Sequence, residues 1–324
     1  MMKKFQIATE AVLIIIFLSF SLIRIVGCGL TKGGNREANT DKSEMTVSDY
    51  LRRGNKLYEE GDFATASLMY WSALRKDSSL VEPRIKLANI YFYRNNWNDD
   101  AMVQLDRVVE LESKNAEAHF LRGKIFRNDG LSGEAAKEYL LALKAEPQNP
   151  GFRYHLGALY HANQLYEEAI KEYKLAINYD TNLTRPRFEP APYGLQARFM
   201  LARLYKQTQR IDEAIDELEK VIAIDETYQD AKNDLIDLLD LKAQSVSRGG
   251  DARDYSWALE LYERVVQLDP ERSDAWVEIG KIKYYWLDKP KEALEAFQKA
   301  SELDPTHPDV ILHMKSLQQE LGLE

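Results

Sequence analysis

The chain has few of the residues and motifs that catalytic and metal-binding proteins use. Its single cysteine, Cys28, makes an intrachain disulfide impossible. The sequence contains no P-loop, no HExxH motif and no glycine-rich phosphate loop. No two of its histidines have the four-residue spacing of helical zinc ligands: they are His119, His155, His161, His307 and His313. We therefore expect no enzymatic activity, no metal site and no cofactor.

Basic residues are also in the minority. The chain has 43 lysines and arginines against 52 acidic residues, which gives a formal net charge of −9 at pH 7. A surface of this sign repels phosphate backbones and anionic lipid headgroups. We therefore expect no nucleic-acid partner.

Long apolar runs are missing as well, and the longest candidate stands near the N-terminus. Ala11 to Ile23 is a mostly apolar run of 13 residues that follows Lys3 and Lys4. A membrane-spanning helix needs about 20 residues, whereas the core of a secretory signal peptide has about 7–15. The run therefore predicts a signal peptide over residues 1–27.

The residues behind this run, Ile25-Val26-Gly27-Cys28, resemble a bacterial lipobox. The resemblance implies cleavage before Cys28 and acylation of that residue, for example with palmitate. Gly29 stands where inner-membrane lipoproteins typically carry Asp, which implies the outer membrane, facing the periplasm, if the source is Gram-negative. Residues 28–46 are polar after the cysteine and predict a flexible tether. An uncleaved transmembrane anchor, with Arg24 snorkelling, stays open as the alternative.

One small residue returns along most of the remaining chain. Its consecutive positions are 35, 34, 34, 45, 44 and 35 residues apart: Ala66, Ala101, Ala135, Ala169, Ala214, Ala258 and Ala293. A second small residue precedes six of them by 12 or 13 positions: Gly54, Ala88, Gly123, Gly157, Ala202 and Gly280. A fixed period of this length is typical of a solenoid of stacked units.

Residues 150–183 show what one unit contains. Arg153, Leu156, Gly157 and Tyr160 share one face of a helix, and Ala169, Tyr173, Ala176 and Ile177 share one face of the next. The unit is therefore predicted to be an antiparallel helix pair. The two small residues allow the helices to cross closely, and Tyr173 fills the space beside the crossing.

This pattern resembles the tetratricopeptide repeat, which has a 34-residue period and a closing proline. The resemblance implies an all-α fold, an α-solenoid wound as a right-handed superhelix. It divides the chain into four repeats over residues 47–183 and three over 195–307. Residues 308–324 follow as a helix with one apolar stripe, which is the cap that a solenoid end requires.

Two stretches depart from the period. Residues 184–194 are an insertion whose three prolines prevent a continuous helix. The sixth repeat has about ten extra residues near 244–253 and carries Ile236 where a small residue is expected, so we expect looser packing there. Each stretch is either a plain surface loop or a partner contact or hinge.

The resemblance also implies that the first helix of each repeat lines an inner groove that binds a protein or peptide segment. Transferred position by position, it indicates these groove residues: Asn55, Tyr58, Asn89, Phe92, Tyr93, Phe120, Lys124, Arg127, Tyr154, Phe199, Arg203, Lys206 and Tyr284. Aromatic residues and arginine dominate many binding surfaces. Several of these rings could instead pack between helices.

These observations predict a non-catalytic scaffold, anchored to a membrane by its N-terminal lipid, that assists assembly of a cell-envelope complex. The layout is similar to that of pilotin lipoproteins of type IV pilus secretins and of repeat lipoproteins of exopolysaccharide systems. Two alternatives stay open: a transmembrane-anchored adaptor that faces the cytoplasm, and an accessory subunit that presents a substrate to a separate enzyme.

Overall fold

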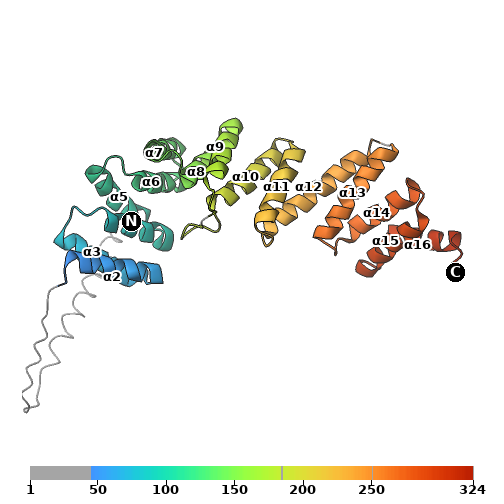
Figure 1. Ribbon diagram of the computed structural model, residues 1–324, viewed down its shortest axis with the longest axis horizontal. Helices are drawn as coiled ribbons and strands as arrows, with labels where there is room; N and C mark the ends of the chain where they lie inside the picture. Colours follow the sequence, from blue (N-terminus) through green and yellow to red (C-terminus); the bar gives the residue numbers. More distant parts are fainter. Residues whose placement is uncertain (1–44, 184, 250, 324) are drawn as a thin grey trace, which may run out of the picture. The chain divides into compact units, whose positions relative to one another are not determined.

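Helices follow one another in pairs along the computed structural model, which describes residues 45–183, 185–249 and 251–323 (Figure 1). The pairs are α2 (Val47–Glu60) with α3 (Phe63–Lys76), α4 (Glu82–Ile90) and the π-helix η1 (Tyr91–Asn95) with α5 (Asn98–Leu111), α6 (Ala116–Asn128) with α7 (Ser132–Ala145), α8 (Pro150–Ala162) with α9 (Tyr166–Tyr179), α10 (Tyr193–Gln207) with α11 (Ile211–Ile224), α12 (Gln229–Ser247) with α13 (Ala252–Leu268), and α14 (Ser273–Tyr285) with α15 (Pro290–Leu303); α16 (Pro308–Glu320) follows alone. The described residues contain no strand. The predicted α-solenoid is confirmed.

Some predictions concern residues that the structure does not cover. The signal peptide over 1–27, the acylated Cys28 and the tether up to residue 44 all lie outside the described residues. Among the residues that are described, no helix is long and apolar enough to cross a membrane.

The periodic small residues lie where the two helices of a pair cross. All seven periodic alanines, from Ala66 to Ala293, are completely buried. A β-carbon added to Gly123 would lie 2.6 Å from the ring of Tyr139, and one added to Gly157 would lie 2.9 Å from the ring of Tyr173. The ring thus occupies the space that the missing side chain leaves, as the pattern predicts.

Charged side chains tie the two helices within several pairs. Arg153 of α8 donates to Glu172 of α9 over 2.7 Å, and Arg198 of α10 donates to Glu217 of α11 over 2.6 Å. The side chains of Arg153 and Glu172 are 18% and 10% exposed, so water screens the attraction weakly. These ties fix the start of a first helix against the middle of its partner.

The sixth pair is built differently from our expectation. Its extra residues continue the helices, so that α12 has 19 residues and α13 has 17, against 14 in α11. Ile236 is 5% exposed and belongs to the core cluster of α9 to α15. The expected looser packing is not found, because the added residues extend the contact between two helices instead of forming a long loop.

Candidate functional site

The insertion between α9 and α10 lies against the first three helix pairs. Tyr193 and Gly194, predicted to end the insertion, already belong to α10. The remaining described residues, 185–192, are called the inserted loop below. The backbone N–H of Glu189 donates to the carbonyl of Pro186 over 3.2 Å. This turn presents the side chains of three consecutive residues, Arg187, Phe188 and Glu189.

Phe188 lies among aromatic rings of three helices. Its ring stacks on Tyr93 of η1, with 4.6 Å between the centroids and 13° between the planes. It also meets the edge of Tyr58 of α2 at 6.1 Å and lies 5.9 Å from the ring of Phe63 of α3. Offset and edge-to-face contacts of this kind each add attraction beyond the apolar area that they bury.

Arg187 binds the C-terminal end of α2. Its guanidinium donates to the carboxylate of Glu59 over 2.8 Å and to the backbone carbonyls of Tyr58 and Glu59. It also lies 5.0 Å above the ring of Tyr58. Because the last carbonyls of a helix carry partial negative charge, this end of α2 attracts a cation.

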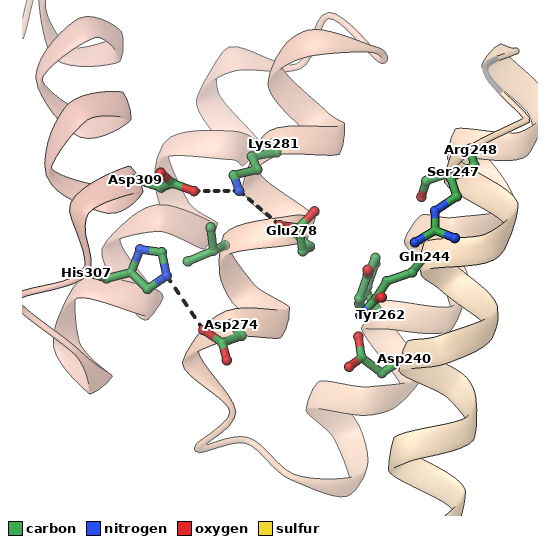
Figure 2. Close-up of a pocket in the computed structure, with 11 residues that line it drawn as sticks. Asp240, Gln244, Ser247, Arg248, Tyr262, Asp274, Glu278, Lys281, His307 and Asp309 are labelled. Atoms are coloured by element: carbon green, nitrogen blue, oxygen red, sulfur yellow. Dashed lines mark hydrogen bonds and ion pairs between the residues drawn. The ribbon is translucent and has the colours of Figure 1, made fainter.

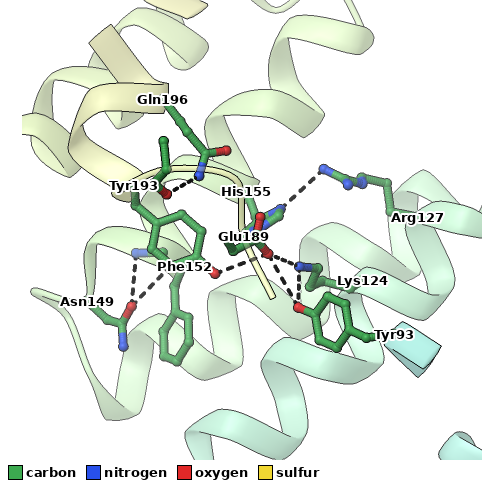
Figure 3. A network of polar contacts seen from close by, with 11 residues as sticks. Tyr93, Lys124, Arg127, Asn149, Phe152, His155, Glu189, Tyr193 and Gln196 are labelled. Atoms are coloured by element: carbon green, nitrogen blue, oxygen red, sulfur yellow. Dashed lines mark hydrogen bonds and ion pairs between the residues drawn. The ribbon is translucent and has the colours of Figure 1, made fainter. Parts of the chain in front are cut away.

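Glu189 forms a buried ion pair at the centre of a polar network (Figure 3). Its Oε1 accepts from Lys124 Nζ of α6 over 2.6 Å and from the hydroxyls of Tyr93 and Tyr193 over 3.4 Å each. Lys124 also donates to the hydroxyl of Tyr93 over 2.5 Å. The side chains of Lys124 and Glu189 are 5% and 11% exposed.

His155 of α8 completes the network. Its Nδ1 lies 3.3 Å from Arg127 Nη1, and because arginine only donates, Nδ1 accepts and Nε2 carries the proton. That Nε2 is 3.8 Å from Glu189 Oε1 and has no hydrogen-bond partner among the described residues. The residues that face the inserted loop, Tyr58, Phe63, Tyr93, Lys124 and His155, are called the loop-binding surface below.

Burial and the facing charges set the protonation states of this network. Burial alone would raise the pKa of Glu189, but the interactions with His155 and Lys124 outweigh it and lower that pKa to about 2. Burial, followed by the positive charge of Lys124, lowers the pKa of His155 to about 3. Burial lowers the pKa of Lys124 as well, against the attraction of the Glu189 carboxylate, which raises it. At neutral pH Glu189 is therefore a carboxylate facing Lys124, and His155 is a neutral imidazole.

Two local features of the backbone place these side chains. Tyr93 lies on η1, and such π-helical turns are frequent at functional sites. A β-carbon on Gly151 would come within 2.5 Å of the ring of Tyr193, so only glycine at the start of α8 leaves room for that ring beside Glu189.

Most of the predicted groove residues in the first four pairs lie in or beside this site. Tyr93, Lys124 and Arg127 belong to the polar network, Tyr58 contacts Phe188, and Phe120 lies 5.4 Å below the Lys124 ammonium. Phe92 is partly buried against the edge of Tyr93. Tyr154 is partly buried between the rings of Tyr173 and Tyr193.

Asn55 and Asn89, predicted to line the peptide-binding groove, have partners within the chain. Asn55 donates to Glu82 over 2.8 Å, and Asn89 donates to Glu117 over 3.2 Å. Each bond joins the first helix of one pair to the first helix of the next. The prediction that they bind a peptide stays untested.

The remaining predicted residues lie in the C-terminal half, away from the inserted loop. Phe199 is 6% exposed and packs on Tyr228, whereas Arg203 and Lys206 share Asp234 at 3.6 and 3.1 Å. Tyr284 donates to Glu320 of α16 over 2.8 Å. These side chains do not converge with the first group on one site.

A separate pocket of about 550 Å³ lies between α12, α14 and the start of α16 (Figure 2). Asp240 of α12 and Arg248, which follows its last residue, face Glu278 and Lys281 of α14 across it. Lys281 is already paired with Glu278 and with Asp309, at 3.0 and 2.6 Å. The charges of this pocket largely satisfy one another.

The sequence interpretation missed the residues that the groove contacts. Arg187, Phe188 and Glu189 were assigned to an insertion interpreted as either a surface loop or a partner contact or hinge, with no role for the single residues, and His155 was considered only as a zinc ligand. A basic-aromatic-acidic triplet between Pro186 and Pro190 was the available signal. No group of three or more metal-ligating side chains occurs among the described residues.

Comparison with known families agrees with this architecture. A family model described as a tetratricopeptide repeat matches residues 85–150, 134–182 and 250–308, and a second model of the same description matches 195–228. Together they cover more than half of the chain. The chain belongs to the tetratricopeptide-repeat family.

Curated relatives share only part of this tetratricopeptide-repeat chain. The probable UDP-N-acetylglucosamine–peptide N-acetylglucosaminyltransferase SPINDLY of Solanum lycopersicum is 32% identical over 107 residues, which are 33% of this chain and 11% of that protein. The SPINDLY protein of Petunia hybrida is 29% identical over 117 residues, 36% of this chain and 12% of that protein. The chain thus spans about a tenth of the length of these relatives.

A solved structure from Cytophaga hutchinsonii shows the same tetratricopeptide-repeat fold. The C-terminal part of a repeat-containing protein from Cytophaga hutchinsonii superposes with a TM-score of 0.55 at 15% identity, over 82% of this chain and 99% of that one. The pilF protein of Pseudomonas aeruginosa superposes with a TM-score of 0.46 at 19% identity, over 75% and 98%. The second superposition is too loose to support an inference about function.

Proposed function

We propose that this protein is a non-catalytic, lipid-anchored scaffold that binds a segment of a partner protein and assists assembly of a cell-envelope complex of the pilus, secretion or exopolysaccharide type. Membership of the tetratricopeptide-repeat family supports binding of a protein or peptide. The lipobox-like residues before Cys28 support export and a lipid anchor, and Gly29 behind the cysteine supports the outer membrane, facing the periplasm, if the source is Gram-negative.

One observation carries the binding part of the proposal. The loop-binding surface, built from the first helices of consecutive pairs and Phe63 of α3, already contacts three consecutive residues of polypeptide. It does so with a ring stack, an ion pair and a cation at a helix end. The same surface is therefore chemically suited to a segment of another protein.

Charge reversal on the first helices tests this function. The variant Lys86→Glu with Arg203→Glu changes two such positions, and Lys144→Glu with Lys299→Glu makes the same change on the second helices α7 and α15. We expect cross-linking in membranes, followed by quantitative mass spectrometry, to lose specific partners with the first variant and retain them with the second. Equal recovery of partners with both variants would remove the support for the groove.

The anchor is tested separately by the intact mass of the membrane-extracted protein. We expect a chain that begins at Cys28 and carries added acyl mass, and loss of that species in Cys28→Ala. A full-length, unmodified chain would instead favour an uncleaved transmembrane adaptor.

A further inference from the structure

The helix pairs on either side of the inserted loop pack directly on one another. Helix α10 packs directly against α9 and against α8 without the loop between them. The residues of the loop that point away from this junction contact α2, α3, η1 and α6 instead. The loop therefore contacts this surface as a ligand does, through side chains at the tip of a turn.

The loop-binding surface requires an acidic partner. Lys124 is almost completely buried, and Glu189 is the one carboxylate within ion-pair distance of it in the part of the chain that the structure describes. A buried ammonium group without a counter-charge is strongly unfavourable. Any segment that replaced the loop would therefore have to bring a carboxylate to the same place.

The loop also leaves one interaction unmade. The protonated Nε2 of His155 is buried, points toward Glu189 and has no hydrogen-bond partner among the described residues. A carboxylate placed about 1 Å closer would accept from both Lys124 and His155. A ligand that is free to position itself can thus satisfy the site better than the tethered loop.

Space remains beside the loop for a larger ligand. A pocket of about 290 Å³ borders Arg187 and Phe188 and is lined on its other side by Lys86, Asn89 and Glu117. Lys86 and Asn89 lie on α4, which continues into η1 with Tyr93, and Glu117 lies on α6 with Lys124. A longer segment could therefore continue from the aromatic contact into this pocket.

We propose that the inserted loop is an intramolecular ligand of the loop-binding surface, and that a partner protein binds there by presenting a turn with the same basic-aromatic-acidic triplet, displacing the loop. This proposal rests on the binding function proposed above and specifies the partner's chemistry. The basic residue binds the carbonyl end of α2, the ring stacks on Tyr93, and the carboxylate pairs with Lys124. Because the loop competes for the surface, only a ligand that binds more tightly than the loop displaces it.

A labelled peptide with the chain's own residues 185–191, Arg-Pro-Arg-Phe-Glu-Pro-Ala, tests the proposal by fluorescence anisotropy against the full chain. We expect the variant Arg187→Ala with Phe188→Ala and Glu189→Gln to bind it at least tenfold more tightly than the wild type does. Adding Lys124→Met should abolish that gain, whereas adding Lys299→Met on α15 should not. A peptide with Gln in place of its Glu should bind neither form.

Equal affinity of a folded triple variant and the wild type would overturn the proposal, because the loop would then not compete. If the triple variant does not fold, hydrogen exchange of the wild-type chain decides. Excess peptide should then accelerate exchange of the backbone amides in residues 185–192. No change in that exchange would also overturn the proposal.

The outcome is separable from the function proposed above. Cross-linked partners that depend on Lys86 and Arg203, but that the peptide does not displace, would refute the triplet ligand and leave the scaffold function standing. Partners that depend on neither the first helices nor the peptide would refute both.

Discussion

At the residue scale, the packing of four helix pairs depends on a glycine, a position without a side chain. Gly54, Gly123, Gly157 and Gly280 each face an aromatic ring of the partner helix, at 2.6 to 2.9 Å from where a β-carbon would lie. A side chain there would have to push the ring out of a close-packed interior.

Gly123→Ala should therefore destabilise the chain, although alanine is the better helix former. The new methyl group would overlap the ring of Tyr139, and we expect a loss of about 1–3 kcal/mol in the free energy of unfolding. Gly133→Ala on α7 is the matched control, since nothing lies within 4 Å of its β-carbon, and it should be neutral or stabilising by up to about 1 kcal/mol. Urea denaturation measures both, and equal effects would contradict the packing argument.

His155 makes the stability of the chain depend on pH. Burial and the charges of Lys124 and Arg127 hold its pKa at about 3 in the folded state, against 6.5 when exposed. The unfolded chain therefore binds the extra proton between these values, so stability falls as the pH falls below 6.5. The pKa of Glu189 is lowered from 4.5 to about 2, so protonation of this group in the unfolded chain lowers the unfolding free energy further below pH 4.5.

We expect the wild-type chain to lose roughly 2–3 kcal/mol of unfolding free energy between about pH 6.5 and pH 4.5 through His155. His155→Gln has no imidazole and should show a flatter pH profile over that range. Denaturant titrations at a series of pH values compare the two, and parallel profiles would show that His155 is not the group responsible.

At the scale of the helix, a buried ion pair fixes one element against the next. Arg153 and Glu172 join α8 to α9, and Arg198 and Glu217 join α10 to α11 in the same way. Removing one partner of such a pair leaves the other, largely buried charge without its main counter-charge, which costs more than the pair itself contributes.

Glu172→Ala should accordingly lower the unfolding free energy by about 2–4 kcal/mol. The double variant Arg153→Met with Glu172→Met should lose less, because no charge is left unpaired. Glu302→Ala, which breaks the exposed pair with Lys299, should change stability by less than about 0.5 kcal/mol. If the double variant loses more unfolding free energy than Glu172→Ala, the attraction between Arg153 and Glu172 contributes more than the cost of an unpaired charge.

At the scale of the whole described region, each helix pair mainly contacts its neighbours, and the inserted loop is the exception. Arg187 and Glu59, which form an ion pair, are 128 residues apart in the sequence. In a solenoid with neighbour contacts alone, a local defect spreads only to adjacent units. The loop adds a long-range link that joins the fourth and fifth pairs to the first three.

Gly280→Ala in the last pair should test this separation. Its β-carbon would lie 2.9 Å from the ring of Phe297, so α14, α15 and α16 should loosen. Hydrogen exchange should rise within residues 273–320 and stay unchanged in α2, α6 and the inserted loop. A uniform rise along the chain would indicate a single cooperative unit instead.

The periodic sequence determined the fold because the contacts within a pair are local. Small residues and rings such as Gly157, Ala169 and Tyr173 lie within one unit, so their spacing alone predicts the helix pair and its close crossing. The ties between successive first helices could also have been predicted, because Asn55–Glu82 and Asn89–Glu117 recur at separations of 27 and 28. The carboxylate partner of Lys124, Glu189, could not have been predicted in this way, because it lies in the insertion and not at a repeat position.

Only the tertiary structure decided what the loop-binding surface contacts. Phe188 meets Tyr58 and Phe63 from more than 120 residues away, and no repeat position encodes such a pairing. The insertion interrupts the period, so the pattern gave no position for its side chains. Its placement depends on the charge buried at Lys124, the ring on η1 and the carbonyl end of α2, which come together only when the helix pairs are stacked.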